Sequence, residues 1–372
     1  MVLRNRNRMQ KEKEANNESE QEAKMAAIEL GHLKKFVLRI PSLYFCSIRL
    51  TAACTQSCMQ CSIPAQSDGS FIDLQHFETI LKKLKQHGSK RITLTGGEPA
   101  IHPQLEEIFR LLAKYEFTNT ALLTNLYYPE ELQDKVIDLV CKYEIGINTS
   151  YDGFAGIADK LRGATDVQKI VERGMLKINE ARSKCVYSHR PTATAVISQL
   201  NMHQIPDVIQ RIKALDWNLN IDVYRYSSDN HREQDKMKIK NKDDLLCLLP
   251  LIQQAQHLKT PLWYFEGWQK QKQKQCPYMI SPTFGSKFFV HENGDIYTCL
   301  HESLGNLLHD EIKDIFASDQ WKAAKAQFAQ CPGCWNTCYT ISSRALSYLH
   351  LGTIRQYLQK DKTLHRTAEV PQ

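Results

Sequence analysis

The chain has 372 residues, of which 42% are hydrophobic and 24% are charged, as in a globular protein with one large domain and a smaller one. No apolar run reaches the roughly 18 residues of a membrane helix. The polar N-terminus lacks the apolar core of a secretory signal, so we expect a cytoplasmic protein with no membrane contact. The net charge of +7 is small for this length, and no basic stripe with interleaved aromatics indicates nucleic-acid binding.

Predicted strands and helices alternate along most of the chain. Short runs of β-forming residues precede longer segments with apolar residues at helical spacing, a pattern typical of a parallel sheet with crossover helices. Six such units are too few for a closed eight-stranded barrel, so we expect an α/β fold in the form of an open, partial (β/α)6 barrel of the TIM type. The predicted strands are 43–51, 91–95, 118–124, 145–150, 192–198 and 219–226, and the predicted helices are 74–87, 103–115, 129–142, 166–182 and 203–214.

The alternation stops near residue 240, where we place the main domain boundary. A helix is predicted over 243–256, and a cysteine-rich region follows it. The segment before the barrel is charged and poor in aromatics, so we expect it to be disordered or a frayed helix. The expected divisions are an extension at 1–36, the barrel at 37–240, a helical linker at 241–275, a small cysteine-rich domain at 276–345, and a terminal helix and tail at 346–372.

Three of the twelve cysteines follow the first predicted strand, at Cys54, Cys58 and Cys61. In a reducing compartment such a group indicates metal binding or catalysis rather than disulfides. Three thiolates can hold three irons of a [4Fe–4S] cluster and leave the fourth iron open. A zinc ion is the alternative, although it would need a fourth ligand nearby. The isolated cysteines are interpreted as small buried hydrophobes: Cys46, Cys141, Cys185 and Cys247.

A glycine-rich motif, GGEP, follows the second predicted strand. Gly96 and Gly97 let the backbone approach a ligand closely, and Glu98 can accept a charge-assisted hydrogen bond from an amine. This motif, one βα unit after the cysteine group, makes the chain resemble the radical S-adenosylmethionine (SAM) family over residues 42–235. The segments LLTN (122–125), SYDG (150–153) and KLRG (160–163) resemble further motifs of that family.

The resemblance implies that SAM chelates the open iron through its amino and carboxylate groups. An electron from the cluster would then cleave SAM to a 5′-deoxyadenosyl radical, which removes a hydrogen atom from the substrate. It also implies a reducing partner such as flavodoxin or ferredoxin. Gln60 departs from the family, which usually carries an aromatic residue before the third cysteine. The SAM-site residues that the resemblance implies are Gly96, Gly97, Glu98, Pro99, Thr124, Asn125, Ser150, Asp152 and Arg162.

Five further thiols lie in the C-terminal region. The hairpin signature ending at Cys299 and the CPGC that follows resemble the SPASM and Twitch auxiliary-cluster domains. That resemblance implies a second, auxiliary [4Fe–4S] cluster, for which we expect Cys276, Cys299, Cys331 and Cys334 as ligands. Cys338 can replace either of the last two, and a structural zinc is an alternative. The candidates for a hydrogen-atom donor or a general base are Cys338, Asp295, His301 and Glu302.

The substrate is open at the level of the sequence. Peptide-modifying members of the family often carry an N-terminal recognition domain, and residues 1–36 are too short and too polar to form one. We therefore expect a small-molecule substrate such as a sugar or polyol, with a peptide- or protein-modifying maturase as the alternative. A non-catalytic zinc or iron–sulfur binding module would explain the C-terminal cysteines but would leave GGEP, SYDG and KLRG without a role.

Overall fold

A computed structural model describes residues 45–63, 68–117, 119–184, 189–224, 234–261, 264–265, 287–299 and 302–331. Its centre is a sheet in the order β6-β5-β4-β3-β2-β1-β7-β8. All neighbouring strands pair in parallel except β7 and β8, which form an antiparallel hairpin. The strands are β1 Phe45–Arg49, β2 Arg91–Thr95, β3 Asn119–Thr124, β4 Gly146–Ser150, β5 Thr192–Ile197, β6 Asn218–Val223, β7 Lys287–Val290 and β8 Ile296–Tyr297.

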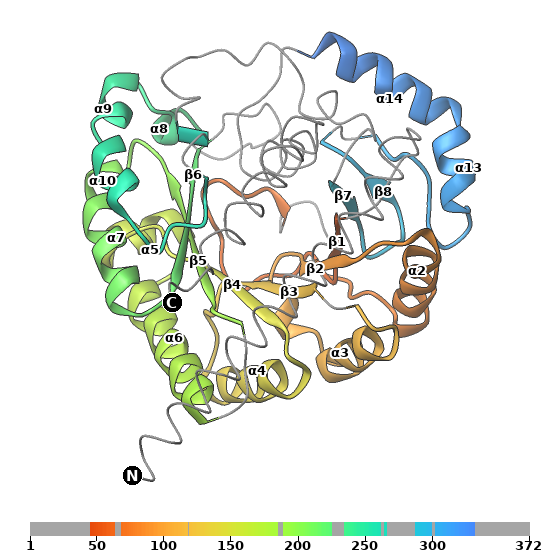
Figure 1. Cartoon of the computed structure of the whole chain (residues 1–372), viewed down its shortest axis with the longest axis horizontal. Coiled ribbons are helices and arrows are strands. Elements are labelled where there is room, and N and C mark those ends of the chain that lie inside the picture. The colour runs from red at the N-terminus through yellow and green to blue at the C-terminus, as the bar shows by residue number, and fades with distance from the viewer. Residues whose placement is uncertain are drawn as a thin grey trace, which may run out of the picture.

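The helices lie around the outside of the curved sheet (Figure 1). Within the described residues, none of them is both long enough and apolar enough to cross a membrane. The helices are α2 Leu74–His87, α3 Leu105–Lys114, α4 Glu130–Tyr143, α5 Ala155–Arg162, α6 Val167–Lys184, α7 Ile205–Ala214, α8 Gln234–Met237, α9 Lys242–Leu246, α10 Leu249–Gln254, α13 Ile312–Ala317 and α14 Asp319–Gln330, with 3-10 turns at Pro99–Ile101 and Met202–Gln204.

Alternation along the strands separates the core from the concave face of the sheet. In β2, Ile92 and Leu94 are fully buried under the helices, whereas Thr93 and Thr95 on the opposite face are half-buried. Successive side chains of a strand point to opposite faces, so one face can be apolar and the other polar. The helices thus cover an apolar layer, and the inner face of the barrel keeps hydroxyl groups within reach of a ligand.

The predicted fold class is confirmed, and all six predicted strands are present, with ends shifted by at most a few residues. The predicted helix 243–256 is wrong in its continuity, because a turn separates α9 from α10 and Pro250 stands at the start of α10. Cys247, expected to be buried, is exposed in this turn, whereas Cys46 is buried as expected. Helix α5 was not predicted at all.

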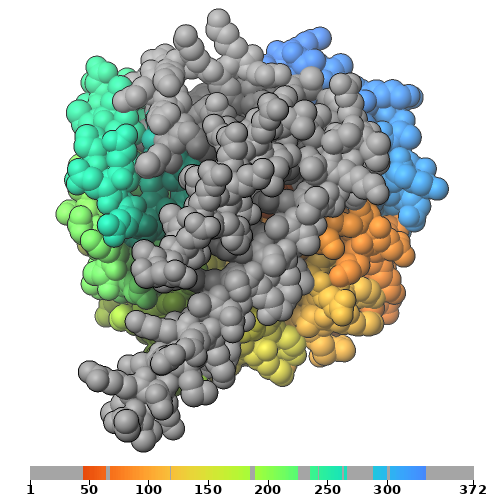
Figure 2. Space-filling model, viewed as in Figure 1, coloured from red at the N-terminus to blue at the C-terminus, as the bar shows by residue number. Residues whose placement is uncertain are grey.

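The C-terminal region does not sit apart from the barrel sheet. β7 pairs in parallel with β1, in a register that sets Phe288 beside Cys46. Phe288 also packs against Phe316 and Trp321 of α13 and α14. Figure 2 shows the blue surface of these helices beside the orange surface of α2. The sheet therefore continues across the predicted boundary, and the β7–β8 hairpin is attached directly to the first barrel strand.

Candidate functional site

The candidate site lies at the carboxyl ends of β1 to β4, where parallel α/β folds build their sites. β1 leads into residues 50–63, which we call the cysteine loop. β2 leads into residues 96–98, β3 ends at Thr124 before Asn125, and β4 leads into residues 150–153. Because these strands pair in parallel, their ends lie at one edge of the sheet. The structure thus brings together segments that are far apart in the sequence.

One side of the cysteine loop is held by the glycine-rich turn after β2. The Gly97 N–H donates to the Thr51 carbonyl at 2.9 Å, and the Glu98 N–H donates to the Ala53 carbonyl at 2.8 Å. A Cβ atom on Gly96 would lie 2.2 Å from the Thr51 oxygen, and one on Gly97 would lie 2.2 Å from the Ala53 oxygen. The glycines therefore allow the turn to lie against the loop backbone, which is a different close approach from the ligand contact expected from the sequence.

The other side of the loop is held by the end of α5. The Ser57 N–H donates to the Arg162 carbonyl at 3.0 Å, and the Met59 N–H donates to the Leu161 carbonyl at 2.9 Å. Gly163 has a left-handed φ of 59°, and a Cβ atom there would lie 2.3 Å from the Ser57 oxygen. Glycine adopts this conformation without steric cost. The KLRG segment therefore terminates α5 and clamps the cysteine loop at the same time.

Two side-chain donors point at the loop's sulfur atoms. Asn125 Nδ2 donates to Cys54 Sγ at 3.7 Å, and Arg162 Nη1 donates to Cys58 Sγ at 3.8 Å. Cys58 is buried, and Cys54 and Cys61 are half-buried. Hydrogen bonds to cluster sulfurs are among the features that set the properties of iron–sulfur sites. The loop thus presents three thiols, two of which face N–H donors from other strands and helices.

The Cys54 thiol lies close enough to Cys58 and Cys61 for their charges to affect its pKa. Burial raises the pKa of the Cys54 thiol to about 11, with further contributions from the negative charges of Glu98, Cys58 and Cys61. Within the described ranges, no three His, Cys, Asp or Glu side chains converge as a single metal ion would require. A four-iron cluster binds each thiolate through a different iron, so its ligands need not meet at one point. The donor set is thus compatible with a cluster.

Glu98 is a fully buried carboxylate that accepts hydrogen bonds from three neighbours. Its Oε1 accepts from the Ala100 N–H at 3.0 Å and the Thr124 hydroxyl at 2.8 Å, and its Oε2 accepts from the Asn125 N–H at 2.7 Å. Burial raises the pKa of Glu98 to about 7, against the opposing effect of these bonds. Glu98 therefore ties the end of β2 to the end of β3, a structural task that the sequence did not indicate. Its predicted contact with the SAM amine stays a prediction.

Asp152 and Arg162 form a buried ion pair, with side chains 1% and 11% exposed. Asp152 Oδ1 also accepts from the Val196 N–H at 2.8 Å, and Arg162 Nη2 donates to Oδ2. Burial opposes the charge on Arg162, but the Asp152 and Cys58 groups outweigh it and raise the arginine pKa. Ser150 lies half-buried at the end of β4. The motif residues are brought together as expected, whereas their predicted contacts with SAM stay predictions.

Two of the five thiols expected near the auxiliary cluster, Cys299 and Cys331, lie within the described residues. Cys299 follows β8, Cys331 ends α14, and both pack partly buried against the main core. Cys276, Cys334, Cys338 and His301 lie outside the described residues, so the predicted ligand set stays a prediction. Among the cysteines that the structure describes, none forms a disulfide with another.

Asp295 lies in the turn region of the β7–β8 hairpin. Its carboxylate accepts hydrogen bonds from Asn293 Nδ2 and Asn306 Nδ2, each at 2.9 Å, and from the Tyr297 hydroxyl at 3.4 Å. These bonds join the hairpin to the segment before α13. The Asp295 carboxylate thus has a structural role. The side chain of Glu302, another candidate, is exposed. Their predicted roles as general bases stay predictions.

An ion pair that the sequence analysis missed lies between β1 and the hairpin. Arg49 Nη2 donates to Glu292 Oε1 at 2.9 Å, Arg49 Nε donates to Oε2, and the two side chains are 16% and 11% exposed. Beside it, His291 stacks on Tyr297 with ring centroids 4.1 Å apart. Burial and the Arg49 charge lower the pKa of His291 to about 4. The available signal was the lone charge of Arg49 at the end of an otherwise uncharged strand.

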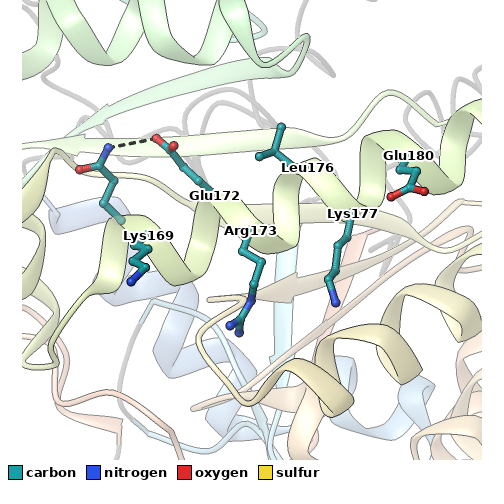
Figure 3. Close-up of a pocket in the computed structure, with 7 residues that line it drawn as sticks. Lys169, Glu172, Arg173, Leu176, Lys177 and Glu180 are labelled. Carbon is teal, nitrogen blue, oxygen red and sulfur yellow. Dashed lines mark hydrogen bonds between the residues drawn. The ribbon is translucent and has the colours of Figure 1, made fainter.

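A surface pocket lies along one face of α6, away from the cysteine loop (Figure 3). Several of its charged groups already have partners: Glu172 accepts from Arg211, and Lys177 pairs with Glu130 and Asp134. Leu176 is its exposed apolar residue. Because most of its charged groups are paired within the chain and none of its lining residues belongs to the sequence motifs, the pocket is a weaker candidate for the functional site than the strand ends.

Comparison with known families agrees with the geometry of the strand ends. The Radical SAM superfamily profile matches residues 48–217, and the SPASM iron-sulfur cluster-binding domain profile matches residues 283–339. The chain belongs to the radical SAM superfamily. It is therefore an enzyme that uses SAM and an iron–sulfur cluster, with a SPASM domain that binds further cluster iron. The first match contains the cysteine loop and all four SAM-site motifs, and the second contains the β7–β8 hairpin.

Individual relatives extend the similarity over most of the chain. It is 22% identical to the sporulation killing factor maturation protein SkfB of Bacillus subtilis strain 168, over 77% of this chain and 68% of SkfB. It is 25% identical to the PqqA peptide cyclase of Bradyrhizobium diazoefficiens, over 45% of this chain and 43% of the cyclase. SuiB of Streptococcus suis, bound to its precursor peptide SuiA, shares the fold with a TM-score of 0.60 and 15% identity, over 82% and 71% of the two chains.

One feature of the cysteine loop departs from the usual pattern of the family. Gln60, at the position where the family usually has an aromatic residue, has a buried side-chain oxygen with no hydrogen-bond partner within the described residues. An unpaired buried acceptor costs about 1–3 kcal/mol. The site therefore offers three thiols, two N–H groups that face their sulfurs, and one unpaired acceptor. This set of groups fits a polar cofactor bound through sulfur better than a structural metal ion with four protein ligands.

Proposed function

We propose that this radical SAM enzyme modifies a peptide, which its auxiliary SPASM cluster helps to oxidise. Support comes from the relatives that match it broadly: SkfB is a maturation protein, the cyclase acts on the PqqA peptide, and SuiB binds a precursor peptide. This revises our expectation of a small-molecule substrate, which rested on the short polar N-terminal segment. The segment's length is a weaker argument than similarity along three quarters of the chain.

The observation that carries the catalytic part of the proposal is the clamped cysteine loop. Six backbone and side-chain contacts hold it: two from the turn at Gly97, two from the end of α5 at Leu161 and Arg162, and one each from Asn125 and Arg162 to the sulfurs. A loop that is held from two sides can keep three thiols in place on three irons of a cluster, while the fourth iron binds another ligand. Sites that must repeat one geometry need this preorganisation.

The chain's own residues bind and orient the reactants. Cys54, Cys58 and Cys61 would hold the cluster, and Ser150 offers a hydroxyl at the end of β4 for a polar group of SAM. When bound, the cluster and SAM supply the 5′-deoxyadenosyl radical that abstracts a hydrogen atom from the peptide.

The concave face of the sheet supplies peptide-binding groups. Thr93, Thr95, Asn148 and Thr194 are half-buried on it, and the Thr194 hydroxyl donates to Asn148 Oδ1 at 2.8 Å. Leu123 is 36% exposed among them. Hydroxyl and amide side chains can pair with the N–H and C=O groups of a peptide backbone. This lining supports a polar, uncharged segment of the substrate near the radical.

The first test counts clusters. After anaerobic reconstitution, the chain should hold about eight iron and eight sulfide atoms, by the four-iron stoichiometry of such clusters. The Cys54→Ala/Cys58→Ala/Cys61→Ala triple variant should keep about half and should lose the cleavage of SAM to 5′-deoxyadenosine. A triple variant with unchanged iron content would remove the cysteine loop from the site.

The second test identifies the substrate class. The reduced enzyme is incubated with SAM and with synthetic copies of the peptides that neighbouring genes encode, and the products are analysed by mass spectrometry. We expect one peptide to lose hydrogen atoms or to gain a cross-link. This change should occur with the wild-type enzyme and not with the triple cysteine variant. If no neighbouring peptide changes while a sugar or polyol does, the small-molecule alternative is correct.

A further inference from the structure

Arg162 and Asn125 reach the cysteine loop from opposite sides and end at different sulfurs. Arg162 Nη1 lies 3.8 Å from Cys58 Sγ, and Asn125 Nδ2 lies 3.7 Å from Cys54 Sγ. From the sequence both residues were expected to bind SAM. We propose that Arg162 and Asn125 set the reduction potential of the cysteine-loop cluster by donating hydrogen bonds to the thiolates of Cys58 and Cys54. The inference rests on the proposed function, since it needs a cluster at this loop.

The orientation of Asn125 is determined by its other contacts. The Tyr127 N–H donates to Asn125 Oδ1 at 2.8 Å, which identifies the oxygen of the amide. The other amide atom is therefore the nitrogen, whose two hydrogens can reach the Thr55 hydroxyl at 3.0 Å and Cys54 Sγ. In the reversed orientation, the amide NH2 of Asn125 would face the Tyr127 N–H, which is also a donor. The N–H···S contact thus follows from the network rather than from an arbitrary choice of atoms.

The orientation of Arg162 is determined by Asp152. The two terminal nitrogens of the guanidinium diverge: Nη2 binds Asp152 Oδ2, and Nη1 points to Cys58 Sγ. Asp152 is itself held by the Val196 N–H, and its side chain is 1% exposed. A guanidinium keeps its donors in a rigid planar fork. Asp152 is therefore a positioning residue that aims the charge of Arg162 at the sulfur.

The sign of the effect follows from electrostatics. Reduction adds one electron to the cluster, supplied by a one-electron donor such as a reduced flavin or iron–sulfur protein. A cation and an N–H dipole beside the thiolates stabilise the more negative, reduced state, and burial strengthens the effect because the surroundings screen it less. Both donors should therefore raise the reduction potential, and removing them should make the cluster harder to reduce.

The test is a redox titration of the holoenzyme without SAM, followed by electron paramagnetic resonance. The signal that the triple cysteine variant lacks belongs to the cysteine-loop cluster, so that variant serves as the blank. The main variant is Arg162→Gln/Asp152→Asn, because Arg162→Gln alone would leave a buried unpaired carboxylate that lowers the potential by itself. The matched control is Arg211→Gln, which removes a partly buried arginine paired with Glu172 on the outer helices.

We expect the double variant to hold the same iron content and to have a tenfold lower ratio of reduced to oxidised cluster at a given potential, which equals a shift of 59 mV for one electron. Asn125→Ala should shift the potential in the same direction by less, and Arg211→Gln should not shift it. If the double variant loses its cluster, Asn125→Ala decides the question alone. A wild-type potential in cluster-bearing variants would overturn the inference.

Failure of the proposed function would look different. If the wild-type chain and the triple cysteine variant carry the same clusters, then no cluster sits at the cysteine loop and both proposals fall. If the potential is unchanged in the double variant but its affinity for SAM drops in equilibrium dialysis, then Arg162 binds SAM as the sequence suggested, and only the tuning role is wrong. A potential shift with unchanged SAM affinity is the pattern that the thiolate contacts predict.

Discussion

Replacing Gly97 by alanine should detach the cysteine loop from the barrel. The added Cβ would lie 2.2 Å from the Ala53 oxygen and 2.5 Å from the Ala52 oxygen, both of which are backbone atoms. A side chain could rotate away from such a clash, whereas these atoms can move only if the loop moves. Movement would strain or break the hydrogen bonds from Gly97 to Thr51 and from Glu98 to Ala53.

The magnitude follows from these two effects. Overpacking a closely packed site costs about 1–3 kcal/mol, and each lost hydrogen bond costs about 1 kcal/mol. Gly97→Ala should therefore lower the free energy of unfolding by about 1 kcal/mol if the loop shifts intact and by up to about 5 kcal/mol if both bonds break. In either case the thiols after Ala53 are displaced, and the cluster content should fall with them.

The matched control is Gly156→Ala. Gly156 lies in the first turn of α5, and a Cβ atom there would have no neighbour within 4 Å. Alanine is the better helix former, so this variant should be as stable as wild type or up to about 1 kcal/mol more stable. Urea unfolding of the apoprotein, followed by circular dichroism, measures stability, and iron analysis after reconstitution measures the cluster. If Gly97→Ala matches Gly156→Ala in both measurements, the clamp on the loop is wrong.

Three further outcomes are expected. Glu292→Gln should lower the free energy of unfolding by about 1–3 kcal/mol, because it weakens the charge-assisted hydrogen bonds with Arg49, and a double-mutant cycle with Arg49→Gln should show coupling between the two. The pKa of Glu98, raised to about 7, means that the folded apoprotein binds a proton more tightly than the unfolded chain does. This tighter binding stabilises the folded state by about 3 kcal/mol below about pH 4.5, and the stabilisation is lost as the pH rises through 7. Urea unfolding at a series of pH values measures this dependence, and Glu98→Gln should remove it. Replacing Cys276 and Cys299 together by alanine should abolish product formation but leave slow cleavage of SAM, provided that circular dichroism shows a folded barrel; product from this variant would contradict an electron-carrying role for the auxiliary cluster.

Local patterns were enough to predict the barrel. The apolar periodicity of residues 74–87 and the β-forming run of residues 91–95 match α2 and β2 to the residue, because Asp73 caps the start of the helix and Gly88 ends it. The helix predicted over 243–256 failed, since periodicity alone does not register the turn that separates α9 from α10. The short helix α5 was missed for the opposite reason, because eight residues carry too little periodicity.

The motifs of the site were also readable, but their contacts were not. The sequence alone determined which residue types belong to the site, among them three thiols, two glycines, two carboxylates and an arginine, since chemistry and spacing are local properties. Only the tertiary structure decided what they touch. Gly96, Gly97 and Gly163 accommodate the backbone of the cysteine loop, and Glu98 joins two strands. Arg162 faces Asp152 and Cys58, and β7 pairs with β1 across some 240 residues of chain, because such contacts depend on how distant segments meet in space and leave no pattern in either segment by itself.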